Sequence, residues 1–250
     1  MMRRSLLALA CLLIWASSAQ AAWVCSTGSV VNIQAGVVSA TAVLPTDAPA
    51  NATKWALFIN RSNTTNVLTA VASTADATGW VASPNSPQTI GSTINYVYYK
   101  VGAAAGADTV TGTWDGVINT QTVTGWCEDD ASGDAQTFQG EATITTITSS
   151  TAWVSNTLAL SASGGIIGLM ASSSTWASVT PNSGETYASG NAAGVRAFAF
   201  TKASGVATVG MDVTAGTSST GAIWILGFHN PGAGTTCTGG LTLLGAGKCE

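Results

Sequence analysis

The sequence is 250 residues long, and only 8% of its residues are charged, against roughly 25% in a typical globular domain. Hydrophobic residues make up 46% of the chain and nine residues are Trp, so it can build a core and does not have the composition of a disordered protein. The formal net charge is −4, from eight basic and twelve acidic residues. This balance argues against nucleic acid and anionic membranes as partners, because both require clustered Lys and Arg.

The first 21 residues have the three parts of a secretory signal peptide. Arg3 and Arg4 supply positive charge, an apolar run covers Leu6–Ala16, and Ala19–Ala21 forms a small-residue cleavage site. The run is about ten residues long, whereas a membrane-spanning helix needs roughly 20. We therefore expect cleavage after Ala21 and a secreted or cell-surface protein without membrane insertion. Loss of two arginines gives the mature chain a net charge of 6 − 12 = −6.

Strand-like segments follow one another along the rest of the chain. Each is rich in β-branched or aromatic residues, is bounded by Gly, Pro, Asn or Ser, and in several cases alternates with period two. The clearest segments are Thr53–Asn60, Ile94–Val101, Val117–Trp126, Ala142–Thr148, Gly165–Met170, Val195–Thr201 and Ala222–Phe228. No segment after residue 21 shows a helical period with caps. The pattern predicts an all-β protein.

Recurring landmarks indicate an internal duplication. The tryptophan pairs are Trp55/Trp153 (153 − 55 = 98), Trp80/Trp176 (176 − 80 = 96) and Trp126/Trp224 (224 − 126 = 98). The short motifs Pro84–Ser86 and Gly106–Val110 return as Pro181–Ser183 and Gly205–Val209. A unit slightly shorter than a hundred residues explains these separations, with repeat units at about 22–130 and 131–236.

Two arrangements of the units are compatible with this pattern. They can form the two similar halves of one jelly-roll-like β-sandwich over residues 22–236, or two tandem sandwiches of immunoglobulin size. The connecting segment Glu128–Asp134 is polar, short and free of Pro. We therefore favour the single sandwich, followed by a C-terminal tail over residues 237–250.

The strand and turn series Val67–Ser86, Tyr96–Trp126 and Ile166–Phe228 resembles the Ser/Thr/Gly-rich, duplicated β-sandwich proteins of bacterial surfaces and tailed-phage virions. The resemblance covers most of the chain after the signal peptide and is one of pattern, without a diagnostic motif. It implies a structural or adhesive role and transfers no functional residues. The signal peptide departs from the virion members.

Four cysteines remain after Cys11 leaves with the signal peptide: Cys25, Cys127, Cys237 and Cys249. An even number of cysteines in a secreted chain predicts disulfides. Because each half should fold around its own strands, we expect Cys25–Cys127 and Cys237–Cys249, the second bond closing the tail. The alternative pairing, Cys25–Cys249 with Cys127–Cys237, would tie the two ends of the chain together.

The acidic segment between the units has the ligand spacing of a calcium loop. Asp130 stands at position one, Asp134 at position five and Glu141 at position twelve. However, Ala135 occupies the place of the turn-making glycine, and no helices are predicted to flank the segment. Calcium at Asp130, Asp134 and Glu141 is thus the one cofactor hypothesis, and a solvated connector is its alternative.

Three tryptophans lie near turn residues, where a flat ring could stack on a sugar. These are Trp80, Trp114 and Trp176, and packing in the core is the competing interpretation for each. Nucleophile-elbow, zinc-protease and nucleotide-binding motifs are all absent from the sequence. The single histidine, His229, stands at a predicted turn, so we assign no catalytic residue.

The sequence therefore favours a non-enzymatic extracellular protein with a structural or adhesive role. Its partner would be a glycan or a protein surface, or further copies of itself. The first alternative is a carbohydrate-binding module. The second is a secreted glycan hydrolase, because two of the scattered carboxylates could meet in space.

Overall fold

The computed structural model describes residues 23–26, 31–61, 65–129, 134–161, 164–176, 178–189, 195–204 and 207–229. These residues form seventeen strands and no helix, and the strands make up 70% of the described residues. Across the same ranges no helix could cross a membrane. The predicted all-β class is confirmed.

An eight-stranded antiparallel sheet forms the first half of the molecule. Its strands are β1 (Trp23–Cys25), β2 (Val31–Val43), β3 (Thr53–Asn60), β4 (Leu68–Ser73), β5 (Val81–Ala82), β6 (Gln88–Ile90), β7 (Thr93–Lys100) and β8 (Thr109–Asp129). The order is β1-β8-β3-β7-β5, with β2 and β4 also on β8 and β6 on β7. Strand β8 is 21 residues long and pairs with β2 along most of its length, with β4 near its start, and with β3 and β1 near its end.

A seven-stranded antiparallel sheet forms the second half. Its strands are β9 (Thr137–Glu141), β10 (Thr145–Val154), β12 (Gly164–Trp176), β13 (Val179–Pro181), β14 (Thr186–Ser189), β15 (Val195–Ser204) and β17 (Asp212–His229). The order is β10-β17-β12-β15-β14, with β9 and β13 also on β17. Strands β11 (Leu158–Ala159) and β16 (Thr208–Val209) form a separate two-stranded sheet.

The two halves share one strand arrangement. In each, a long last strand, β8 or β17, pairs with four others, so that β1, β2, β3 and β4 correspond to β9, β10, β12 and β13. Strand β7, on the far side of β3, corresponds to β15 on the far side of β12. The predicted β-sandwich built from two similar halves is therefore confirmed.

The tryptophan landmarks of the predicted repeat are not equivalent in the structure, so this part of the prediction is wrong. Trp55 lies on β3, whose counterpart is β12, whereas Trp153 lies on β10. Trp126 and Trp224 do lie on counterpart strands but pack in different cores. Each of the three cores contains tryptophans, so a recurring separation between tryptophans does not fix the strand register.

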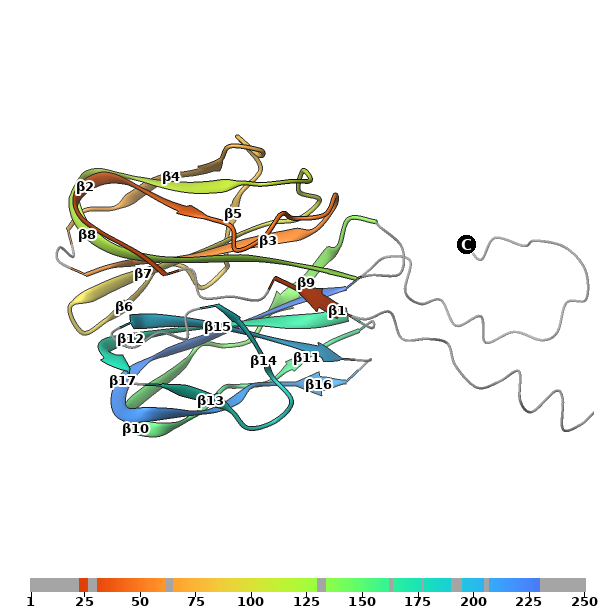
Figure 1. The fold of residues 1–250 in the computed structure, drawn as a ribbon. Coiled ribbons are helices and arrows are strands. Elements are labelled where there is room, and N and C mark those ends of the chain that lie inside the picture. Colours follow the sequence, from red (N-terminus) through yellow and green to blue (C-terminus); the bar gives the residue numbers. More distant parts are fainter. Residues whose placement is uncertain are drawn as a thin grey trace, which may run out of the picture.

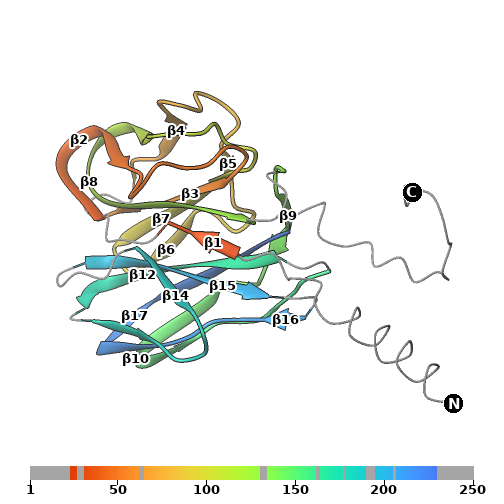
Figure 2. The ribbon, with the colours of Figure 1, turned by 45° about the vertical axis from the view of Figure 1, so that its right-hand side comes forward.

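Three apolar clusters separate the layers of the molecule. One lies between the halves and includes Leu57 of β3 and Leu169 of β12, while each half also encloses a cluster of its own. Figures 1 and 2 show the resulting stack, with β2 and β4 at one end, then β3 with β7, then β12 with β15, and β10 at the other end. Each half thus folds over its own core, which is the feature that the alternative of two small sandwiches predicts. The core between the halves joins the two halves to each other.

Strand β3 shows why the run Trp55–Ile59 is apolar without interruption. All eight of its residues are buried. Successive side chains of a strand point to opposite faces, so Leu57 enters the core between the halves and Phe58 enters the core of the first half. A strand covered on both faces has no solvated side that would require polar residues.

Candidate functional site

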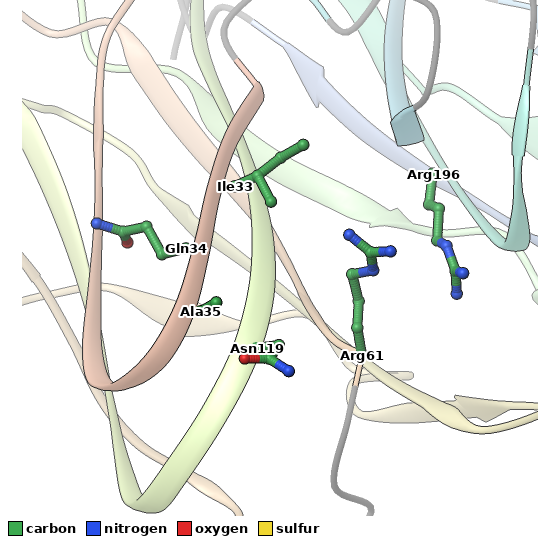
Figure 3. A pocket seen from close by; sticks show the side chains of 6 residues that line it. All are labelled: Ile33, Gln34, Ala35, Arg61, Asn119 and Arg196. Carbon is green, nitrogen blue, oxygen red and sulfur yellow. The ribbon is translucent and has the colours of Figure 1, made fainter.

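A pocket of about 250 Å³ lies where the two halves meet. Strand β2 contributes Ile33, Gln34 and Ala35, and β8 contributes Asn119. Two arginines complete the lining, Arg61 directly after β3 and Arg196 from β15 of the second half. Figure 3 shows both guanidinium groups on the same side of the pocket, opposite the β2 residues.

Backbone contacts hold the two arginines in place. The N–H of Arg61 donates a hydrogen bond of 2.7 Å to the carbonyl oxygen of Asn119. The N–H of Arg196 donates one of 2.9 Å to the side-chain oxygen of Gln121, a fully buried residue of β8. The arginine of the second half is therefore anchored directly to the first half.

The charges in the pocket are not balanced. The ion pairs among the described residues involve Lys54 and Lys202 but neither arginine. Burial and the charge of Arg61 both lower the pKa of Arg196. The Nε atom of Arg196 is buried and has no hydrogen-bond partner within the described ranges. Two like charges without a counter-charge favour the binding of an anion.

Guanidinium groups bind planar or tetrahedral oxyanions through paired N–H donors. Carboxylates and sulfate esters are therefore the groups that Arg61 and Arg196 would recognise. Ile33 is 55% exposed and adds an apolar surface beside the two cations. The six lining residues are two arginines, a glutamine, an asparagine and two apolar residues, so the pocket offers a ligand two positive charges beside polar amide groups.

Comparison with known proteins assigns no ligand to this pocket: no family model, no curated protein and no solved structure matches the chain.

The predicted Cys25–Cys127 disulfide is confirmed. The two residues are directly opposite on β1 and β8, and their Cα atoms are 4.0 Å apart. Cys127 is fully buried in the core between the halves, and Cys25 packs against that core. Cys237 and Cys249 lie outside the described residues, so their pairing stays a prediction.

The prediction that Trp114 and Trp176 are exposed and could stack on a sugar is wrong. Their exposed fractions are 3% and 1%. Trp114 packs edge-on against Phe58 at a centroid distance of 5.7 Å, and Trp176 against Trp153 at 4.9 Å. Both lie close to turns in the sequence, but the folding of each sheet over itself covers them.

Trp80 remains partly exposed. It lies in the loop between β4 and β5, and its Nε1 donates a hydrogen bond of 3.2 Å to the carbonyl oxygen of Asp76. Its ring also packs against the core of the first half. Of the three tryptophans, it alone keeps a surface that a ligand could contact.

The three predicted calcium ligands are not brought together within the described part of the chain, where no cluster of three or more metal-binding side chains occurs. Asp130 lies outside the described residues, and Asp134 is exposed. Glu141 instead accepts hydrogen bonds from the Asn85 N–H (3.0 Å) and the Ser83 hydroxyl (3.3 Å). Burial raises the pKa of Glu141 against the opposing effect of these bonds. Glu141 therefore links β9 of the second half to the first half.

Sequence reasoning overlooked both arginines of the pocket. The chain contains four arginines, and two of them, Arg3 and Arg4, fall in the predicted signal peptide. The other two, Arg61 and Arg196, line the same pocket although 135 residues separate them (196 − 61 = 135). The scarcity of arginine was the available signal, but nothing local to either residue indicated that they meet.

Proposed function

We propose that this protein is a secreted, non-enzymatic surface protein that adheres to an acidic glycan. Arg61 and Arg196 would bind a carboxylate or sulfate group of one sugar residue. The pocket is smaller than the roughly 300–1,000 Å³ typical of sites for drug-sized ligands, and a single charged sugar residue suits it better than a long ligand.

One observation carries this proposal. The two arginines that remain after the signal peptide come from different halves, share one pocket and have no carboxylate in its lining. The rest of the chain is acidic, so it would repel anionic polymers at long range. Recognition would then depend on contact with these two guanidinium groups rather than on general charge attraction.

The burial of Trp114 and Trp176 supports an electrostatic mode of recognition over ring stacking. Arginine guanidinium groups hold an anionic group through charge and paired hydrogen bonds, which suits an adhesive protein. The pocket also spans the junction of the halves, so its geometry depends on the packed core between them.

The proposal is tested by binding of the purified protein to an array of glycans that carry uronate or sulfate groups. Each acidic glycan is paired with its neutral form, made by carboxyl reduction or desulfation. We expect binding to the acidic forms only, and a loss of about tenfold or more for Arg61→Gln and for Arg196→Gln, from hydrogen bonds to a charged group.

Lys100→Gln is the matched control, because it removes the same charge from β7, away from the pocket lining. It should bind as the unmodified protein does. Equal binding to acidic and neutral glycans, or equal binding by the arginine variants and the control, would contradict the proposal.

A further inference from the structure

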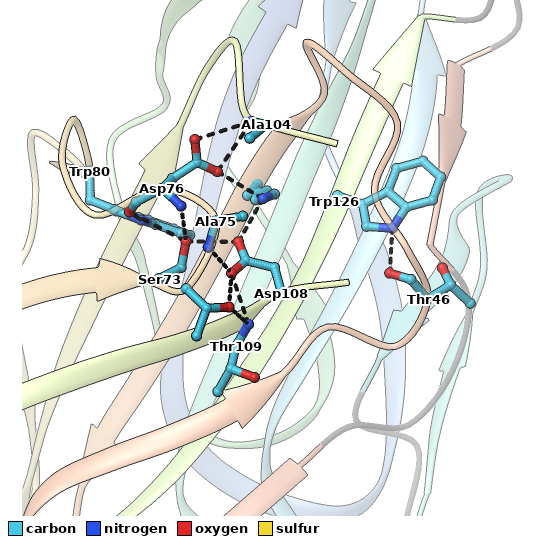
Figure 4. A network of polar contacts seen from close by, with 11 residues as sticks. Thr46, Ser73, Ala75, Asp76, Trp80, Ala104, Asp108, Thr109 and Trp126 are labelled. Carbon is cyan, nitrogen blue, oxygen red and sulfur yellow. Dashed lines mark hydrogen bonds and ion pairs between the residues drawn. The ribbon is translucent and has the colours of Figure 1, made fainter. Parts of the chain in front are cut away.

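Three ionisable side chains meet in the interior of the first half. The Lys54 Nζ atom lies 2.6 Å from Oδ2 of Asp108 and 2.8 Å from Oδ2 of Asp76. The side chains of Lys54 and Asp108 are fully buried, and that of Asp76 is 9% exposed. Figure 4 shows Asp76 and Asp108 converging on this point from the β4–β5 loop and from the start of β8.

The two oxygens of Asp108 have different surroundings. Oδ1 accepts hydrogen bonds from the Thr74 hydroxyl (2.8 Å), the Ala75 N–H (2.9 Å) and the Thr109 N–H (2.9 Å). Oδ2 accepts from the Ser73 hydroxyl (2.7 Å) and faces the lysine. Burial opposes ionisation of Asp108, but the hydrogen bond from Lys54, followed by those from Ala75, Ser73 and Thr74, outweighs it and lowers its pKa to about 2.

Burying this many charges is costly, even when they are paired. Condensation of the amine with one carboxyl group would convert a charged pair into a neutral amide and remove that cost. The required parts are present: an amine in contact with a carboxyl, three donors on one carboxyl oxygen, and a second carboxylate beside the amine. From this geometry we infer that Lys54 and Asp108 join in an intramolecular isopeptide bond, with Asp76 as the proton carrier.

The reaction is balanced without an oxidant or reductant. Asp76 takes a proton from the Lys54 ammonium and passes it to Oδ2 of Asp108, so that the neutral Nζ adds to Cγ of a carboxylic acid rather than of an ionised carboxylate. The negative charge of the adduct forms on Oδ1, where three donors converge, as in an oxyanion hole. The Cγ–Oδ2 bond then breaks, and Oδ2 leaves as water with two of the three ammonium protons. The product is one amide bond and one water molecule.

The second half provides an internal contrast. Lys202 also pairs with a carboxylate, Glu185, but at 3.3 Å, and its side chain is 23% exposed. Within the described residues its ion pairs include no second carboxylate. Lys202 therefore has neither the burial nor the proton carrier that Lys54 has, and we expect no bond there.

The inferred bond has a mechanical consequence. Lys54 is in β3, and Asp108 immediately precedes β8, 54 positions along the chain. A covalent link between them would fasten two layers of the first half at one end. Such a link resists forced unfolding of an adhesive protein, but its existence does not depend on the arginine pocket.

The experiment is mass spectrometry of the intact, secreted protein. The unmodified protein should be lighter than its sequence by one water, beyond the hydrogens lost to disulfides. Protease digestion should then yield a branched peptide that joins the segment containing Lys54 to the one containing Asp108. Asp76→Asn keeps the shape of the side chain but removes the proton carrier, and this variant should have its full mass and lack the branched peptide.

Lys202→Arg is the matched control and should keep both the mass deficit and the branched peptide. Hydroxylamine treatment distinguishes a cyclised aspartate, which it opens, from an isopeptide bond, which survives it. A full mass for the folded, unmodified protein would overturn the inference. A branched peptide that persists undiminished in Asp76→Asn would overturn the role of Asp76.

Discussion

Breaking the Cys25–Cys127 disulfide should destabilise the protein substantially. The bond connects residues 102 positions apart, and the chain-entropy model assigns up to ~4.7 kcal/mol to a loop of this length. Strand β1 has only three residues and pairs with the end of β8. Its backbone pairs with β8 at three positions only, so the covalent bond supplies a large share of what holds β1 in place. In a protein of this size the loss corresponds to a decrease in Tm of roughly 10–20 °C.

The assay is urea unfolding of oxidised and reduced protein in a Cys237→Ala/Cys249→Ala background, which leaves Cys25–Cys127 as the one bond under test. Comparing the two redox states keeps both sulfur atoms in the core, so the difference reports the covalent link and not a cavity. Peptide mapping confirms the pairing. Equal unfolding midpoints for the oxidised and reduced forms would refute the reasoning.

Two further predictions concern the second half. A Cβ added at Gly168 would come within 1.6 Å of the Met211 sulfur, so Gly168→Ala should cost about 1–3 kcal/mol of stability. Combining it with Met211→Ala should cost less than the sum of the single changes, and strict additivity in urea unfolding would contradict the contact. Burial favours the neutral form of Glu185, but backbone N–H donors, including Ser183 and Asp212, and the charge of Lys202 outweigh it and lower its pKa below 4.5. The ionised carboxylate therefore stabilises the fold above pH 4.5, and this contribution is lost as pH falls through the lowered pKa. Glu185→Gln should be less stable than the unmodified protein at neutral pH and equal to it in strong acid, and a deficit that persists in acid would contradict this.

The sequence predicted the central strands well and the long strands only in part. The predicted segment Thr53–Asn60 coincides with β3, because a strand buried on both faces has a long apolar run, here Trp55–Ile59. Only Val117–Trp126 of β8 and Ala222–Phe228 of β17 were predicted, although the strands begin at Thr109 and Asp212. Their first portions are rich in Thr, Ser and Gly and partly exposed, so they lack the apolar pattern on which strand prediction depends.

The candidate site could not be predicted in the same way, because it depends on contacts between the halves. Arg61 and Arg196 meet only after the core between the halves has formed, and no local pattern encodes that meeting. The same reasoning applies to Trp114, which a neighbouring layer covers. The ion pairs of Lys54 could not be predicted either. Lys54 is a single charge next to an apolar run, and its partners Asp76 and Asp108 come from loops later in the sequence.

Arginine side-chain NMR tests the proposed adhesive site most directly. Once the predicted signal peptide is removed, the chain has two arginines, so the spectrum should contain two Nε–Hε signals. Titration with a sulfated or uronate-containing oligosaccharide should shift both signals, whereas its neutral form should shift neither. Binding of the acidic oligosaccharide while both arginine signals stay unchanged would contradict the account.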